Sequence, residues 1–85
     1  MNISYSKTFI KQAKKLDPEL RKKLKERIMI FSDNPTHPTL RNHSLKGKYK
    51  EYRSIDITGD LRALYLQREN EVVFDAVGTH SQLYG

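Results

Sequence analysis

Residues 71–84, EVVFDAVGTHSQLY, join an apolar run to an abruptly polar end, and the rest of the chain is interpreted around them. The run, broken only by Asp75, is typical of a strand that is covered on at least one face and lies inside its sheet. We predict a strand over residues 71–77 that ends at Gly78. Reactive side chains are often displayed at strand ends, and the residues displayed here are Thr79, His80, Ser81, Gln82 and Tyr84.

Residues 49–66 contain the two strands that precede this run. Alternating polar and apolar side chains predict one strand over 49–57 and a second over 61–66. The turn between them is Thr58-Gly59-Asp60, and a second turn at 68–70 leads into the last strand. The three strands therefore predict an antiparallel meander. One face of its first strand carries Tyr52, Ser54 and Asp56.

Residues 2–33 predict a short edge strand followed by two helices. Ser6 is a suitable N-cap for the first helix, and Asp17 with Pro18 ends it and begins the second. Each helix has one apolar stripe, formed by Phe9, Ile10, Ala13 and Leu16 and by Leu20, Leu24, Ile28 and Phe31. Residues 32–48 contain several breakers and predict an extended loop that carries His43.

Helices first and a meander after them predict an α+β fold, in which an N-terminal helical hairpin packs on a small, mostly antiparallel β-sheet. With 85 residues, we expect a single domain over 1–85. The chain has no cysteine, which excludes disulfides and thiolate metal sites and favours a reducing, cytoplasmic location. No apolar run is long enough to span a membrane, and the first ten residues lack the apolar centre of a secretion signal.

Positive charge is concentrated in the first part of the chain. There are 16 Lys and Arg against 10 Asp and Glu, a formal net charge of +6. Residues 7–27 hold nine basic and three acidic side chains, and residues 41–53 hold five and one. Lysine-rich helices can simply keep a small protein soluble. Two separate basic stretches beside reactive side chains favour nucleic acid as the partner.

Several side chains of the loop, hairpin and last strand suit RNA cleavage without a metal. In that reaction the 2′-hydroxyl attacks the neighbouring phosphorus and the 5′-oxygen leaves, which requires a base, an acid and a cation. Histidine can take either proton role, and an arginine can stabilise the phosphorane. The candidates are His43, Arg53, Asp56, Asp60, Arg62, His80 and Tyr84. Taken singly, each also has a structural explanation, such as a loop cap, a turn residue or an exposed strand charge.

Specific motifs resemble the RelE/ParE superfamily of bacterial toxins, and most closely its YafQ-like branch. They are the segment from His43 to Gly47, the pair Tyr52-Arg53, the acid Asp60, and the ending from Gly78 to Gly85. The resemblance covers nearly the whole chain. It implies the RelE-like microbial RNase fold and a toxin that cleaves messenger RNA in the ribosomal A site, without cofactor or metal. It also implies a cognate antitoxin as partner, and is compatible with a toxin–antitoxin heterotetramer.

Residue by residue, the resemblance implies catalytic roles for His43, Asp60, His80 and Tyr84, where Tyr84 stands at a position usually held by phenylalanine. The residues expected to contact RNA and its phosphates are Lys46, Lys48, Arg53 and Arg62. One position departs from the pattern, because Asp56 stands where YafQ-like enzymes have a further histidine and Ser54 replaces a nearby aspartate. An ionised carboxylate cannot donate a proton, so the role of Asp56 stays open, and Arg62 is a candidate to compensate.

Two other functions remain. A ParE-like inhibitor of DNA gyrase would use the same fold as a binding module, although binding alone gives no reason to place histidines at the loop and the strand end. A degenerate toxin would still fold and bind antitoxin, with its activity lost through the changes at Ser54 and Asp56.

Overall fold

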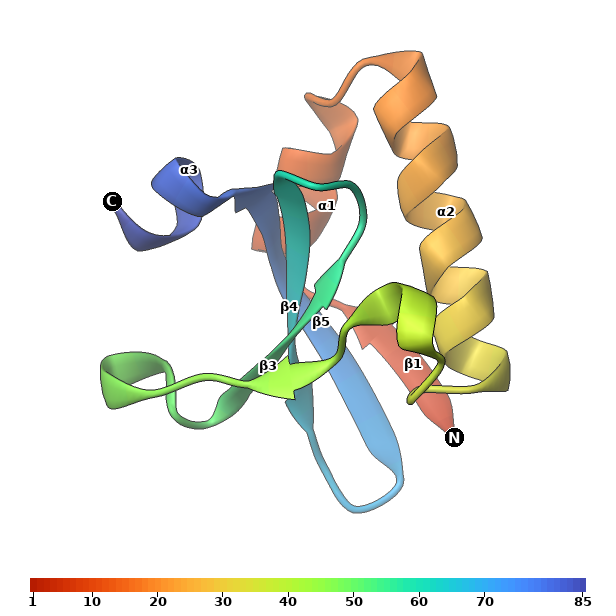
Figure 1. Ribbon diagram of the computed structural model, residues 1–85, viewed down its shortest axis with the longest axis vertical. Coiled ribbons are helices and arrows are strands. Elements are labelled where there is room, and N and C mark those ends of the chain that lie inside the picture. The colour runs from red at the N-terminus through yellow and green to blue at the C-terminus, as the bar shows by residue number, and fades with distance from the viewer.

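Five strands form one mixed sheet in the order β1-β5-β4-β3-β2 (Figure 1). The computed structural model describes residues 1–85. The strands are β1 (Asn2–Tyr5), β2 (His43–Ser44), β3 (Tyr52–Asp56), β4 (Leu61–Gln67) and β5 (Glu71–Thr79). As its apolar sequence predicts, β5 lies inside the sheet, antiparallel to β4 and parallel to β1. The remaining pairs are antiparallel, so the predicted sheet type is confirmed.

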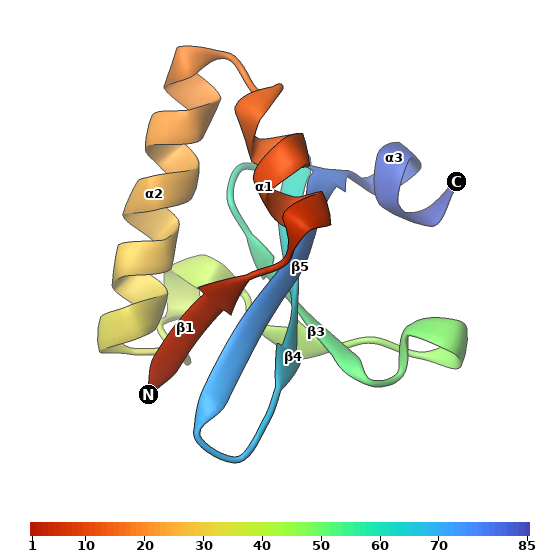
Figure 2. The ribbon, with the colours of Figure 1, turned by 180° about the vertical axis from the view of Figure 1, so that it is seen from behind.

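Two helices, α1 (Lys7–Lys14) and α2 (Pro18–Asp33), form the N-terminal hairpin. Both begin where the sequence predicts. The Ser6 hydroxyl accepts a hydrogen bond from the Phe9 amide at 3.0 Å, and the Asp17 carboxylate accepts one from the Leu20 amide at 2.9 Å. In the view of Figure 2, α1 lies between the viewer and the sheet, and α2 runs along one side of the sheet.

Buried aromatic rings join the helices to the sheet. Phe31 of α2 packs edge-on against Tyr65 and Phe74, with ring centroids 4.9 and 5.3 Å apart. Phe9 of α1 reaches Phe74 at 5.7 Å. Burying each such side chain stabilises the fold by about 1.5 to 3 kcal/mol. This side of the sheet is therefore the core, and the opposite face is not covered by α1 or α2.

Strand register divides the charged residues of the meander between the two faces of the sheet. Directly paired residues of antiparallel strands point to the same side of a sheet. Arg53 pairs with Tyr65, so it faces the helices, whereas Asp56 pairs with Arg62 and Arg62 pairs with Gly78 on the other face. The predicted alternation along β3 is thereby confirmed.

Two predictions about local structure need correction, and one helix was not predicted. Gly78 does not end β5, because it pairs with Arg62 and the strand continues to Thr79. The residues after it form a short helix, α3 (His80–Tyr84). The predicted loop over 32–48 contains β2 and the 3₁₀-helix η1 (Pro38–Leu40). A second 3₁₀-helix, η2 (Gly47–Tyr49), begins near the end of this segment and extends one residue beyond it. No helix is both long and apolar enough to cross a membrane.

Candidate active site

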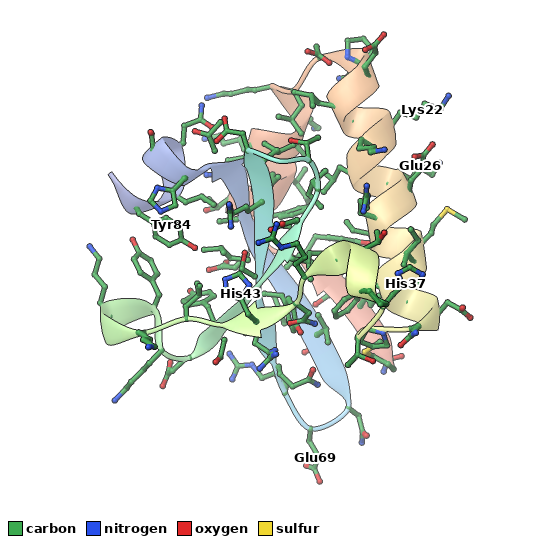
Figure 3. The ribbon with its side chains drawn as sticks, in the orientation of Figure 1. Lys22, Glu26, His37, His43, Glu69 and Tyr84 are labelled. Carbon is green, nitrogen blue, oxygen red and sulfur yellow. The ribbon has the colours of Figure 1, made fainter.

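A groove of about 260 Å³ lies where α3 and the loop between β2 and β3 meet the sheet. It is lined by His43, Leu45, Lys46, Tyr49, Arg62, His80 and Tyr84. Both segments project from the same side of the molecule, away from α2 (Figures 1 and 2). Tyr84 lies on this side and His43 lies near the middle of the sheet, whereas His37 lies near the end of α2 (Figure 3). Five of the sequence-predicted site residues therefore meet: His43, Lys46, Arg62, His80 and Tyr84.

The backbone just before β2 fixes the orientation of the His43 ring. The Nδ1 atom of His43 lies 2.8 Å from the carbonyl oxygen of Arg41. A carbonyl oxygen only accepts hydrogen bonds, so Nδ1 carries the proton and Nε2 of the neutral ring is left as an acceptor. Arg41 itself adopts a left-handed conformation with φ of 47°, which costs a non-glycine residue on the order of 1 kcal/mol. This left-handed residue is the one whose carbonyl contacts the imidazole.

His80 is positioned by a capping box at the start of α3. The Thr79 hydroxyl accepts from the Gln82 amide at 3.2 Å, and the Gln82 side chain accepts from the Thr79 amide at 2.8 Å. Gly78 lets α3 fold back onto the strand, because a Cβ there would lie 3.1 Å from the Gln82 Oε1 atom. The His80 ring, exposed on the first turn, packs against the Tyr84 ring with centroids 4.8 Å apart.

Tyr49 ties the loop between β2 and β3 to α3. Its hydroxyl donates to the Leu83 carbonyl at 3.1 Å, and its ring meets that of Tyr84 edge-on at 5.2 Å. Burial raises the pKa of the Tyr84 phenol, against the opposing effect of the Arg62 charge. Tyr84 is therefore a neutral aromatic wall and not a proton acceptor at physiological pH. The Lys48 ammonium lies over the Tyr49 ring, 5.3 Å from its centroid.

A carboxylate lies between two arginines, one of which lines the groove. One oxygen of Asp56 lies 3.5 Å from Nη1 of Arg62, and the other lies 3.5 Å from Nε of Arg41. The Asp56 side chain is 12% exposed and does not line the groove, whereas its partner Arg62 does. Ser54, one pleat away on the same face, is fully buried.

Besides Asp56, three sequence-predicted residues lie outside the groove. Arg53 faces the helices, where its Nε donates to the Asn42 side chain at 2.9 Å, so the structure places it away from the site at which phosphate binding was predicted. Lys48 does not line the groove, and its ammonium lies over the Tyr49 ring. Asp60 is exposed in the β3–β4 turn, and its carboxylate forms no hydrogen bond with either imidazole. The Arg41 carbonyl holds His43 instead.

Tyr49 and Arg41 contribute to the site but were not among the predicted site residues. Tyr49 had a signal in the sequence, since it lies within the lysine-rich segment 46–50, and aromatic side chains among basic ones are typical of single-stranded nucleic-acid binding. Arg41 had none, because its contribution depends on a backbone conformation. No three His, Asp or Glu side chains gather as a set of metal ligands.

A second, apolar groove of about 500 Å³ separates α1 from α2. Its lining includes three large apolar side chains that are well exposed, Tyr5, Ile10 and Met29. Basic side chains border it, namely Lys14, Arg21 and Lys25. It is distinct from the groove that holds the two histidines, with which it shares no residue.

The fold of this chain is shared with solved structures of bacterial toxins. A YoeB/ParE toxin from Agrobacterium tumefaciens has the same fold, with a TM-score of 0.79 over 94% of this chain and 99% of that one, at 18% identity. The crystal structure of YafQ from E. coli strain BL21(DE3) is 26% identical, with a TM-score of 0.85 over 99% of this chain and 98% of that one. The predicted RelE-like α+β fold is thereby confirmed.

Sequence narrows this class to one family. The family profile described as "Bacterial toxin of type II toxin-antitoxin system, YafQ" matches residues 1–85, and the chain belongs to this family. In the crystal structure of the E. coli DinJ–YafQ toxin–antitoxin complex, the matching chain is 28% identical, with a TM-score of 0.79 over 99% of this chain and 97% of that one. No curated protein sequence matches significantly.

Proposed function

We propose that this toxin is a ribosome-dependent endoribonuclease that cleaves messenger RNA in the ribosomal A site, in the cytoplasm, by metal-independent acid–base catalysis. One observation carries the proposal. Two histidines from distant parts of the chain, an arginine, a lysine and two tyrosine rings line a single groove. Mere binding of a protein such as DNA gyrase would not require two imidazoles beside a cationic, aromatic-walled groove.

The surroundings of the His43 imidazole assign it one proton role, and His80 takes the other. His43 is the general base, because its Nδ1 proton is held by the Arg41 carbonyl and Nε2 is available to accept the proton of the 2′-hydroxyl. The resulting alkoxide forms a bond to phosphorus, and the bond from phosphorus to the 5′-oxygen breaks. His80 donates a proton to that departing oxygen. The products are a 2′,3′-cyclic phosphate and a 5′-hydroxyl.

Cations and rings complete the site. Arg62 and Lys46 neutralise the charge that develops on the non-bridging phosphate oxygens, an electrostatic contribution that can exceed either proton transfer. Tyr84 and Tyr49 offer ring surfaces on which an unpaired base stacks, worth about 1 to 3 kcal/mol per base.

Cleavage of a ribosome-bound messenger by single variants tests the assignment. His43→Ala and His80→Ala should each lose about 10²- to 10⁴-fold in cleavage rate, as expected for removal of a proton-transfer group. His37→Ala is the matched control, because its ring caps η1 away from the groove and accepts from the Thr39 amide. Full activity of both groove variants would refute the mechanism.

A gyrase supercoiling assay distinguishes the proposed endoribonuclease from a ParE-like inhibitor of DNA gyrase. Wild-type protein without ribosomes should leave supercoiling unchanged, whereas inhibition there would favour the ParE-like function. If the wild type neither cleaves messenger nor inhibits gyrase, it is a degenerate toxin.

We further propose that a cognate antitoxin covers the apolar groove between α1 and α2. The DinJ–YafQ complex is a toxin bound to its antitoxin, and a related partner would find exposed Ile10 and Met29 here. Because Lys14, Arg21 and Lys25 border the groove, the segment that fits it is an amphipathic helix with acidic flanks.

Met29→Asp tests this contact. Met29 is 64% exposed, so the substitution should leave the fold intact while placing a carboxylate in the path of an acidic segment. Copurification with the antitoxin encoded beside the toxin should fall at least tenfold, and cleavage should persist. Lys46→Ala, in the groove that holds the histidines, is the control and should copurify with the antitoxin as the wild type does. If Met29→Asp copurifies as well as the wild type, the proposed contact is contradicted.

A further inference from the structure

Asp56 and Arg62 are directly paired residues of β3 and β4, and Arg62 lines the candidate active site. The register at this level of the sheet is Asp56 on β3, Arg62 on β4 and Gly78 on β5. Arg62 therefore has a carboxylate on one side and no side chain on the other. Asp56 is the neighbour in this row that can fix the direction of the guanidinium.

The contacts of this cluster are not those of a pair optimised for stability. Its ion-pair distances of 3.5 Å exceed the 2.7 to 2.9 Å that is typical of a charge-assisted hydrogen bond. Three buried polar atoms have no hydrogen-bond partner: Ser54 Oγ, Asp56 Oδ1 and Arg62 Nε. Unsatisfied buried groups lower stability, and a buried ion pair is weak evidence of stabilisation. Such groups point to a role that requires them.

The two oxygens of Asp56 reach two different parts of the site. One faces Arg62, which lines the groove, and the other faces Arg41, whose backbone carbonyl holds His43. The carboxylate thus lies between the arginine beside the phosphate site and the turn that holds the imidazole. With Arg41, Lys46 and Arg62 nearby, the surroundings remain positive after this one negative charge is counted.

We propose that Asp56 is a positioning residue that holds the Arg62 guanidinium in the groove, where it contacts the phosphate during cleavage. This inference rests on the proposed endoribonuclease function. It assigns a role to the position at which the sequence resemblance leads one to expect a histidine. Asp56 transfers no proton, and the reaction uses it only through Arg62.

A kinetic double-mutant cycle tests the proposal. Asp56→Asn keeps the shape of the side chain and removes its charge. Cleavage at saturating ribosome concentration should fall by about 10²-fold, as misplacement of an active-site group by about 1 Å can cause, while affinity for the ribosome stays within threefold. In an Arg62→Gln background, Asp56→Asn should cause no further loss, because its effect acts through Arg62.

Glu69→Gln is the matched control for charge, since Glu69 lies at the exposed tip of the β4–β5 hairpin, remote from the groove (Figure 3). It should cleave at the wild-type rate. Full activity of Asp56→Asn would overturn the proposal. An equal loss in both backgrounds would also overturn it, because Asp56 would then act independently of Arg62.

A second measurement does not depend on turnover. The Nε–H group of Arg62 should give an ordered NMR signal in the wild type and a more mobile one in Asp56→Asn, while thermal unfolding shows that both proteins are folded. Equal mobility in the two would refute the positioning role. An inactive wild type with the expected difference in mobility would remove the proposed function and leave the Asp56–Arg62 coupling in place.

Discussion

Removal of one oxygen from Tyr49 should weaken the closure of the groove. In Tyr49→Phe the ring that meets Tyr84 at 5.2 Å remains, but the hydrogen bond to the Leu83 carbonyl at 3.1 Å is lost. A neutral hydrogen bond contributes about 0.5 to 1.5 kcal/mol net. If that free energy holds the loop against α3, the loss corresponds to roughly a two- to twelvefold lower population of the closed groove.

Truncation to alanine should have a larger effect. Tyr49→Ala also removes the ring on which a base would stack, for which about 1 to 3 kcal/mol is a typical cost. We expect cleavage of a ribosome-bound messenger to fall roughly fivefold in Tyr49→Phe and about 10²-fold in Tyr49→Ala, by quantification of cleaved message over time. Tyr5→Phe is the matched control, since Tyr5 lies at the other groove.

The ordering of the two variants is the critical result. Equal and complete activity of both would show that the groove does not include the Tyr49 wall. Equal and severe losses would show instead that the hydroxyl alone matters. The first result would remove the contact between the loop and α3 from the account, and the second would remove the stacking role of the Tyr49 ring.

Three further substitutions test the scaffold around the site, each by thermal and denaturant unfolding. The hydrogen bond to Asp75 at 2.7 Å raises the pKa of Tyr52 above its ordinary value of 10.0, so the stability it provides is complete below pH 10 and is lost as pH rises through the higher pKa of the folded state. Tyr52→Phe should therefore lower the free energy of unfolding by about 1 to 2 kcal/mol at neutral pH. The difference in unfolding free energy between the variant and the wild type should shrink above pH 10, and a difference that stays constant with pH would contradict this cause. Gly78→Ala should destabilise the fold by about 1 to 3 kcal/mol and slow cleavage, because the added Cβ displaces α3. Gly59→Ala should do neither, because the added Cβ would lie in open space. Asn42→Ala should cost about 2 to 3 kcal/mol, because it deprives Arg53, Tyr65 and the Pro35 carbonyl of partners, and a cost below 0.5 kcal/mol would refute that network.

The regular elements were predictable because their signals are local. Ser6 and Asp17 cap the helices that follow them, and both caps were expected from residue type alone. The alternation along β3 assigned Arg53 and Asp56 to opposite faces before their neighbours were known. These features depend on side-chain chemistry within a few residues, which a sequence displays directly.

The features that were missed depend on other parts of the chain. Gly78 was expected to break β5, yet pairing with Arg62 keeps it in the strand and α3 occupies the space a side chain would need. The start of α3 did have a local signal, the capping box of Thr79 and Gln82. The two residues of β2 had none, because so short a strand exists only through its pairing with β3.

The candidate site was predicted in part for the same reason. His43, His80, Arg62, Lys46 and Tyr84 were named from their chemistry and resemblance, and they do line one groove. The contacts of Asp56 with two arginines required the cross-strand register and the turn at Arg41. A residue that looked like a departure from the family pattern is thereby placed beside the cation that lines the groove.

Cleavage of a messenger with a single 2′-deoxynucleotide at the scissile position tests the central claim most directly. The proposed mechanism begins with proton removal from the 2′-hydroxyl by His43, so this messenger should bind on the ribosome and remain intact while the all-ribose messenger is cut. The cut product should carry a 2′,3′-cyclic phosphate. Cleavage of the deoxy-substituted messenger at the same position and rate would contradict the account.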